Sequence, residues 1–195
     1  MEEVREKNEF FDLIEDPVSR KLIETLAQLM EKRPLEEIPT SEVIRLSGVG
    51  RSTFYRRFRD KYDLLTRCYQ ELLDRTLAAV PRGLSFRESF FSLYRTLASQ
   101  PAFFRRALAT PGPEGLRSYI FNQSFATYSE MLTRQGMDLE DTVNRLKLIG
   151  YITGALEVTC IWADTGMKLS LEEMFRITFE LMPYDIQMCL ALNYL

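Results

Sequence analysis

The stretch Pro39–Leu65, PTSEVIRLSGVGRSTFYRRFRDKYDLL, decides how the rest of the chain is interpreted. It begins with a short helical pattern in which Val43 and Leu46 share one side. Gly48 and Gly50 follow, and glycine accepts backbone angles that other residues resist. We therefore predict two short helices joined by a tight turn, the first over about residues 40–46 and the second over about residues 51–58.

The second helix is predicted to have two unlike faces. Phe54 and Phe58 lie four residues apart and so form one buried seam. The side chains that must point away from this seam are basic or hydroxylated: Arg51, Ser52, Thr53, Tyr55, Arg56 and Arg57. Such a pair of helices is typical of a helix-turn-helix, whose second helix can enter the major groove of DNA.

The predicted contacts with DNA divide into base edges and phosphates. Arg51 begins the helix and can pair with a guanine, and Thr53 can meet a base edge or a thymine methyl group. Tyr55, Arg56, Arg57 and Lys61 are placed for phosphates. The full predicted set is Thr40, Ser41, Gly50, Arg51, Ser52, Thr53, Tyr55, Arg56, Arg57 and Lys61. The competing interpretation is an ordinary solvated basic face, and the surrounding motif favours DNA.

The charge distribution agrees with this interpretation although the chain is acidic overall. The 195 residues carry a net charge of −3, but residues 40–69 hold seven basic and three acidic side chains, a local charge of +4. Residues 1–39 hold six basic and eleven acidic side chains, a charge of −5. Since DNA feels mainly charges within a Debye length of about 8 Å, a basic region in an acidic chain suits a salt-sensitive binder.

Composition favours an all-α fold and argues against catalysis. The chain is 46% hydrophobic with 9 glycines and 8 prolines, and strand-like alternation is hard to find. Histidine is absent, which removes its acid-base chemistry, Ser-His and Cys-His nucleophiles and the commonest zinc ligand. We predict no enzyme activity, no metal and no cofactor.

Other features favour a cytoplasmic protein. Cys68, Cys160 and Cys189 are odd in number and far apart in apolar stretches, which favours reduced, buried thiols. The acidic start is unlike a signal peptide, and we expect no apolar run long enough to span a membrane.

We expect two helical domains. Residues 1–80 form a three-helix DNA-binding domain, with a solvated arm over 1–15 and a first firm helix capped by Asp16 and carrying Leu22 and Leu26 inward. Pro81–Gly83 marks the boundary. Residues 81–195 form a bundle with helices predicted over 85–98, 101–109, 114–135, 138–164 (capped by Asp138) and 170–182, and a docked helical tail over 184–195. The helices after Asp138 and Ser170 are apolar on more than one face, which implies a second partner.

The central stretch resembles the DNA-binding segment of the TetR family of bacterial transcriptional regulators. The resemblance rests on the glycine turn Gly48-Val49, the run Thr53-Phe54-Tyr55, the aromatic Phe58, and Lys61 followed by Leu64-Leu65. It covers roughly residues 17–80. Family members place residues matching Arg51, Ser52 and Thr53 on bases, and those matching Tyr55, Arg57 and Lys61 on phosphates. Pro39 replaces a usual capping Thr or Ser, a role that Thr40 or Ser41 is expected to take over; Gly50 replaces Ser and Arg57 replaces His.

The resemblance also implies a homodimer that binds a palindromic operator and releases it when a small apolar or amphipathic ligand binds. The implied pocket residues are Phe90, Tyr94, Phe103, Phe104, Tyr119, Phe125, Tyr128 and Trp162, although aromatics at this spacing also suit a plain core. The implied dimer interface comprises Gly150, Gly154, Leu171, Met174, Phe175, Thr178 and Leu181, and the glycine pair suits packing within one chain equally well. An alternative keeps the DNA binding and gives the C-terminal domain a protein partner and no small molecule.

Overall fold

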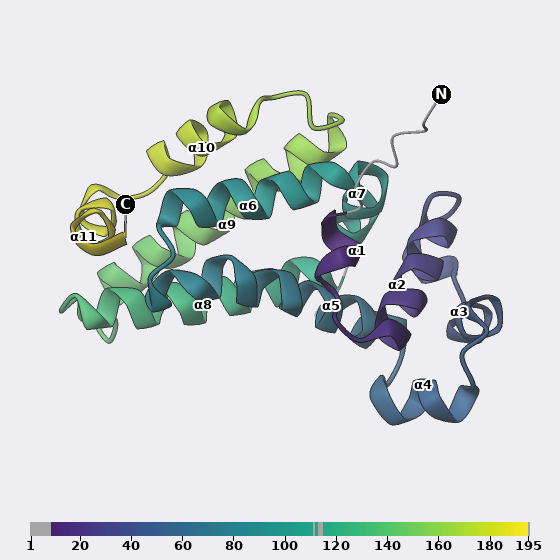
Figure 1. The fold of residues 1–195 in the computed structure, drawn as a ribbon. Coiled ribbons are helices and arrows are strands. Elements are labelled where there is room, and N and C mark those ends of the chain that lie inside the picture. Colours follow the sequence, from purple (N-terminus) through teal and green to yellow (C-terminus); the bar gives the residue numbers. More distant parts are fainter. Residues whose placement is uncertain (1–8, 111, 113–114, 195) are drawn as a thin grey trace.

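The predicted all-α architecture is confirmed by the computed structural model, which describes residues 9–110, 112 and 115–194. Within these residues the chain forms eleven α-helices and two 3-10 helices and no strand (Figure 1). Residues 1–8 of the predicted arm, Pro111 and Pro113 of a predicted loop, the predicted helix start Glu114, and the last tail residue Leu195 lie outside the described residues.

After α1 (Glu9–Leu13), the N-terminal part holds α2 (Pro17–Met30), α3 (Thr40–Ser47), α4 (Arg51–Arg57) and α5 (Lys61–Arg75), with η1 (Leu35–Glu37) before α3. Asp16 caps α2 as predicted, because its carboxylate accepts a hydrogen bond from the Ser19 amide at 2.7 Å. α5 ends at Arg75, and η2 (Leu77–Arg82) leads into the bundle.

The C-terminal bundle contains α6 (Phe86–Ser99), α7 (Pro101–Ala109), α8 (Leu116–Arg134), α9 (Thr142–Asp164), α10 (Leu171–Glu180) and α11 (Tyr184–Tyr194). The helices predicted from residues 85 and 170 begin with capping boxes at Ser85 and Ser170. α9 begins later than predicted, because Asp141 caps it while Asp138 accepts a hydrogen bond in the preceding turn. The helices α2–α4 lie beyond α5 at one end of the molecule (Figure 1).

The prediction of a solvated arm is wrong for residues 9–15. Glu9–Leu13 forms helix α1, and Phe10 and Ile14 are fully buried. The Phe10 ring lies 5.0 Å from that of Phe104 and 5.6 Å from that of Phe103 on α7. One turn of helix is too short to show a hydrophobic period, so the sequence pattern gave no sign of this anchor. α1 contacts α2, α5 and α6, and thus joins the N-terminal helices to the bundle.

The expectation of no membrane-length apolar run is also wrong by length and composition. α9 spans 23 residues and contains an 18-residue window with a mean hydropathy of 1.3. Only 39% of that window is buried inside the chain, with Leu148, Tyr151, Ile152 and Trp162 among its buried residues. A helix that is buried on one side and apolar on another can have this length and hydropathy without crossing a membrane.

We predict that Phe10→Ala lowers the free energy of unfolding by about 3 kcal/mol, because it empties a site between the aromatic rings of α7. The half-buried Phe121, on α8, supplies the control, since Phe121→Ala removes a ring with less buried surface. Urea unfolding followed by circular dichroism measures both variants. Equal losses would show that α1 is not an anchor.

Candidate nucleic-acid interface

The turn between α3 and α4 depends on one of its two glycines. Gly48 closes α3 with a φ of +66°, a left-handed conformation that costs most residues energy. The Ser47 hydroxyl steadies the same turn by accepting a hydrogen bond from the Val49 amide at 3.3 Å. Gly50 has an ordinary φ of −62°, so the predicted need for glycine holds only at Gly48.

The aromatic seam of α4 is confirmed. Phe54 is fully buried, Phe58 is 5% exposed, and their ring centroids lie 5.7 Å apart. On α3 the prediction is half right: Val43 is buried, but Leu46 is 49% exposed and Ile44 takes its place in the core.

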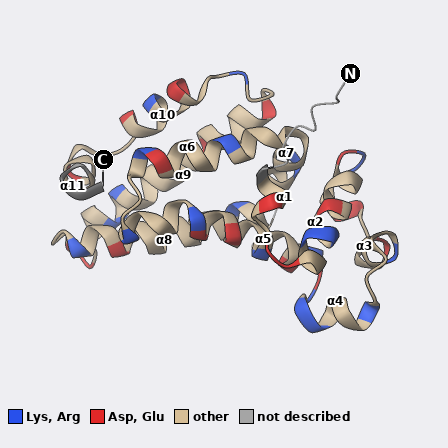
Figure 2. Ribbon diagram, viewed as in Figure 1, with Lys and Arg blue, Asp and Glu red and all other residues tan. Residues whose placement is uncertain are grey.

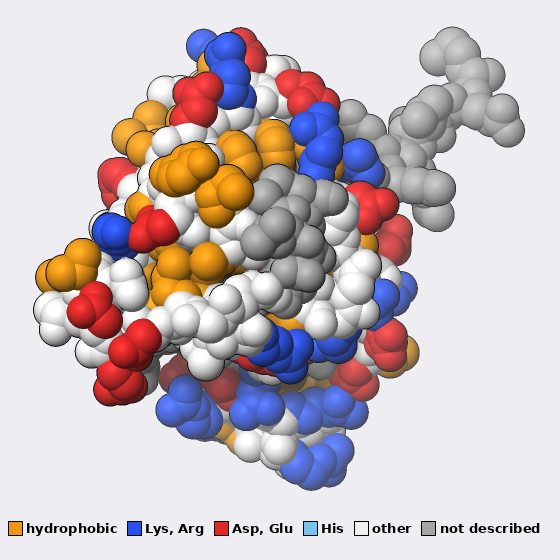
Figure 3. All heavy atoms as spheres, turned by 90° about the vertical axis from the view of Figure 1, so that its left-hand side faces the viewer, with side chains coloured by type: hydrophobic (Ala, Val, Ile, Leu, Met, Phe, Trp, Pro, Cys, Tyr) orange, Lys and Arg blue, Asp and Glu red, His pale blue; other side chains and the backbone are white. Residues whose placement is uncertain are grey.

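The outward face of α4 carries four exposed side chains: Arg51, Ser52, Tyr55 and Arg56. They lie at helix spacings of one and four residues, so they share one surface. The Arg51 guanidinium lies 5.5 Å from the centre of the Tyr55 ring, a cation–π contact along the helix. Basic residues mark both ends of α4 in Figure 2, and Lys and Arg side chains gather at the same end of the molecule in Figure 3.

Arg57 is turned toward the protein. Its Nη1 atom lies 2.9 Å from Asp16 Oδ2, so the guanidinium pairs with the carboxylate that caps α2, and the side chain is 36% exposed. Burial alone would raise the pKa of Asp16, but hydrogen bonds from Ser19 and the charge of Arg57 outweigh it and hold this pKa below its usual value. A pair this exposed contributes at most about 1 kcal/mol, so it positions Arg57 more than it stabilises the fold.

Lys61 lies inside the protein, whereas the sequence had predicted that it faces DNA. It is 8% exposed, and its Nζ atom donates hydrogen bonds to the carbonyl oxygens of Glu36 at 3.0 Å and Ile38 at 2.6 Å. Desolvation lowers the pKa of this ammonium. Lys61 therefore ties the start of α5 to the loop that precedes α3, and a phosphate would have to share it with two carbonyls.

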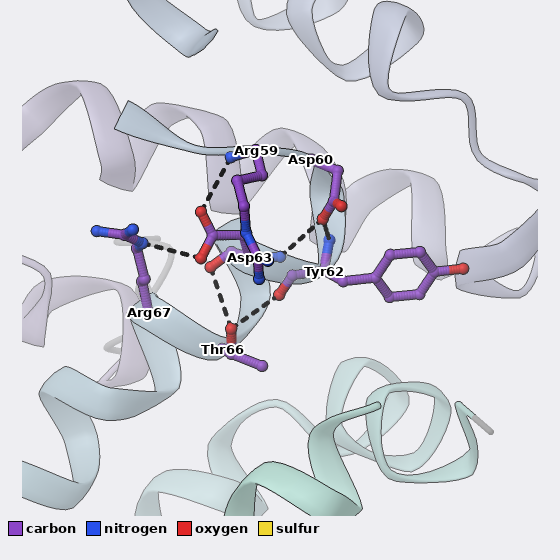
Figure 4. Close-up of polar contacts among 6 residues, drawn as sticks. All are labelled: Arg59, Asp60, Tyr62, Asp63, Thr66 and Arg67. Carbon is purple, nitrogen blue, oxygen red and sulfur yellow. Dashed lines mark hydrogen bonds and ion pairs between the residues drawn. The ribbon is translucent and has the colours of Figure 1, made fainter. Parts of the chain in front are cut away.

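The start of α5 is held by two carboxylates (Figure 4). Asp60 caps the helix by accepting hydrogen bonds from the amides of Tyr62 and Asp63 at 2.8 and 2.9 Å. Asp63 accepts from the Arg59 amide and from Arg67 Nε, each at 2.9 Å. These bonds fix the connection between α4 and α5, and so the angle at which α4 leaves the core.

The predicted caps at Thr40 and Ser41 are absent. Pro39 is the residue before α3, and no side chain accepts a hydrogen bond from the first amides of that helix. Gly50 likewise offers no side-chain cap to α4. Thr40 and Ser41 nevertheless lie at the start of α3, and Gly50 and the half-buried Thr53 lie at the start of α4. These two helix starts form the region predicted to approach DNA.

This arrangement of a sharp glycine turn, a buried aromatic seam and an exposed basic face defines a helix-turn-helix DNA-binding protein. Residues 22–68 match the family described as "Bacterial regulatory proteins, tetR family". This segment is therefore a TetR-family N-terminal DNA-binding domain, and the protein is a DNA-binding transcriptional regulator with a domain typical of non-enzymatic regulators. The match ends within α5 and leaves the bundle outside it. No curated protein matches the chain.

We predict that Asp16→Asn reduces the acid sensitivity of folding while keeping the α2 cap, because Asn also caps helices well. The lowered pKa of Asp16 means that the folded carboxylate adds stability above its unfolded pKa of about 3.9, and that this stability is lost as pH falls through the lower folded value. Urea midpoints measured from pH 6 to pH 2.5 should fall less steeply for the variant. Parallel curves for both proteins would contradict the assignment.

Proposed function

We propose that the protein is a sequence-specific repressor that binds a palindromic operator as a homodimer and leaves it when a small molecule binds. The observation that carries this proposal is the exposed face formed by Arg51, Ser52, Tyr55 and Arg56 on a helix fixed by its phenylalanine seam. Two such helices related by a two-fold axis would read half-sites about one helical turn apart. The protein would work in the cytoplasm, where bacterial DNA lies.

We assign different work to the two exposed arginines of α4. Arg51 stands at the start of the helix, the end that enters the groove in helix-turn-helix proteins, so it is the candidate for guanine. Arg56 lies near the other end, where a guanidinium suits a phosphate. Ser52 and Thr53 are assigned to base edges, and Tyr55 to the backbone. Arg57 and Lys61 would reach phosphates only by leaving or sharing their contacts with Asp16 and the carbonyls of residues 36 and 38.

Selection of genomic fragments by the purified protein supplies the operator, and two variants then test the roles. We predict that Arg51→Ala weakens operator binding about tenfold or more while binding to random DNA changes little, since a bidentate base contact is worth about 1–3 kcal/mol. Arg56→Ala should weaken both by similar factors and reduce the slope of log K against log salt by about one. Equal losses on the two DNAs for Arg51→Ala would refute its base contact, and failure to enrich any fragment would refute sequence-specific binding.

A surface on α9, α10 and α11 supports the homodimer. Val143 and Leu146 are each 60% exposed, and Gly150 has open space where a side chain would lie. Leu181, Tyr184 and Met188 add further exposed apolar groups. The ion pair between Lys147 and Asp185, at 2.5 Å, joins α9 to α11. Hydrophobic side chains stand among charged ones on the face shown in Figure 3. Exposed apolar groups on neighbouring helices are typical of a subunit interface.

The interface expected from the resemblance needs correction. Met174 is fully buried and Thr178 is 4% exposed, so these residues of α10 belong to the core of their own chain. Phe175 packs on Phe90, with ring centroids 5.1 Å apart, and Leu171 is half-buried. Gly154 faces Leu181 of the same chain, leaving Gly150 and Leu181 as the predicted residues most open to a partner.

We predict that Leu146→Asp converts the dimer to a monomer and weakens binding to the full palindrome at least a hundredfold, because it buries a charge at the proposed interface. Leu169→Asp is the matched control, because Leu169 is 42% exposed but lies in the loop before α10. Light scattering after size-exclusion chromatography gives the mass of each protein. A wild-type monomer, or a Leu146→Asp dimer, would reject this surface.

A cavity inside the bundle supports the small-molecule step. Of the eight predicted pocket residues, Phe90, Tyr94 and Tyr128 line it. Phe103 and Phe104 instead pack around Phe10, and the Trp162 indole donates a hydrogen bond to the Leu169 carbonyl. Tyr119 and Phe125 are half-buried on α8 and do not line the cavity.

A boundary near Pro81 would then separate a DNA-binding domain over 1–80 from a ligand-binding and dimerising domain over 81–195. The alternative of a protein partner without a ligand stays a prediction, and the cavity is the observation that favours a small molecule over it.

A further inference from the structure

The wall of the cavity within the bundle contains no charged side chain. The cavity is lined by residues from α5, η2, α6, α8, α9 and α10, and all of them are apolar, aromatic or hydroxylated. Its volume is about 90 Å³. An ionised ligand would therefore lose its hydration without gaining a counter-charge. The free energy of this desolvation is far larger for a charged group than for a neutral one.

Three hydroxyls on this wall are available to a ligand. Tyr69, Ser89 and Ser124 are each less than 9% exposed and line the cavity. Within the described part of the chain, their hydroxyls make no hydrogen bond to another residue. None of the three oxygens is among the fully enclosed side-chain atoms that lack a partner in the described residues, so each is open to the cavity and can donate a hydrogen bond to a molecule that carries an acceptor.

The other hydroxyls of the wall leave further capacity. Thr159 donates to the Ala155 carbonyl at 2.8 Å, so in its 2.6 Å contact with Tyr94 the tyrosine is the donor. Tyr128 and Tyr151 share one hydrogen bond at 3.2 Å, which leaves the accepting tyrosine with a free O–H group. Burial raises the pKa of Tyr94 to about 12 and raises that of Tyr151, so these phenols stay neutral.

The cavity also limits the size and shape of the molecule. Phe90 and Tyr94 stack with centroids 4.0 Å apart and present flat surfaces. An apolar cavity of about 150 Å³ accommodates benzene. A single ring therefore requires some outward movement of the wall, and the half-exposed Leu93, Ile120 and Leu156 are the side chains free to give way.

We propose that this cavity binds a small, neutral, one-ring-sized molecule that carries a hydrogen-bond acceptor such as a carbonyl oxygen, and that it rejects carboxylic acids and amines in their charged forms. The proposal deepens the proposed function, since it names the chemical class of the effector. It also adds a consequence: binding must widen the cavity, so the ligand would act by favouring a more open bundle.

Three compounds of nearly equal shape test the class with the full-length protein and no DNA. Acetophenone is neutral with a carbonyl acceptor, benzoate replaces its methyl group with a charged oxygen, and ethylbenzene lacks the acceptor. Calorimetric titration should detect acetophenone and find benzoate at least tenfold weaker. Binding of benzoate as tight as that of acetophenone, or binding of none of the three, would overturn the proposal.

A hydroxyl-deleted variant tests the acceptor. The triple variant Tyr69→Phe, Ser89→Ala, Ser124→Ala should bind acetophenone about three- to tenfold more weakly and ethylbenzene within twofold of wild type. Tyr119→Phe is the control, because the Tyr119 hydroxyl is buried without a hydrogen-bond partner in the described residues but does not line the cavity. Should the triple variant fail to fold by circular dichroism, Tyr69→Phe and Ser124→Ala are measured singly. Equal losses for both ligands would remove the acceptor from the proposal.

Operator release is measured separately, by adding acetophenone to the protein–DNA complex. Binding to the free protein without release would keep the ligand class and reject the effector role. Release by acetophenone and by benzoate alike would reject the class.

Discussion

The exposed basic face of α4 depends on the burial of two phenylalanine rings. A helix of seven residues is too short to persist alone, because the entropy of its first turn is barely offset by its few hydrogen bonds. α4 is held by Phe54 and Phe58, which bury its inner side, and by the Asp60 and Asp63 carboxylates that fix the following turn. The positions of Arg51, Ser52, Tyr55 and Arg56 follow from this seam, since a rigid inner face determines where the outer face points.

Two polar contacts made by residues outside α4 also help to set the position of this helix. Asp16 at the start of α2 holds Arg57 at the end of α4, and Lys61 at the start of α5 holds the loop before α3. Each contact uses a basic side chain that a count of positive charges would assign to DNA. The positive surface of the free protein is therefore narrower than the local charge of +4 suggests, and on α4 it consists of Arg51 and Arg56.

The sequence predicted the parts of the fold that depend on local chemistry. Capping residues such as Asp16, Ser85 and Ser170 act within four residues, so their helices begin where predicted. The i, i+4 seam of α4 was predictable for the same reason. Other features could not be predicted, because they depend on residues that are distant in the chain. These are the contacts of Arg57 and Lys61, the burial of Phe10 against α7 and the burial of Met174 in the core. Only three of the eight residues predicted to line the cavity do so, for a related reason. Aromatic spacing indicates which face of a helix is buried, but it does not distinguish rings that line a cavity from rings that fill the core.

α5 offers a physical route between the proposed ligand site and the recognition helix. Tyr69 lines the cavity and packs on Phe104 with a centroid distance of 6.1 Å, while Phe104 contacts Phe10 of α1. Lys61 stands eight residues earlier on the same helix, about 12 Å along its axis at 1.5 Å per residue. A helix with intact hydrogen bonds transmits displacement with little compression, so a ligand that displaced Tyr69 along with Leu93, Ile120 and Leu156 would move the end of α5 that holds the loop before α3. In a dimer that reads two half-sites, such a shift changes the separation of the recognition helices, and this is the quantity to which palindrome binding is most sensitive.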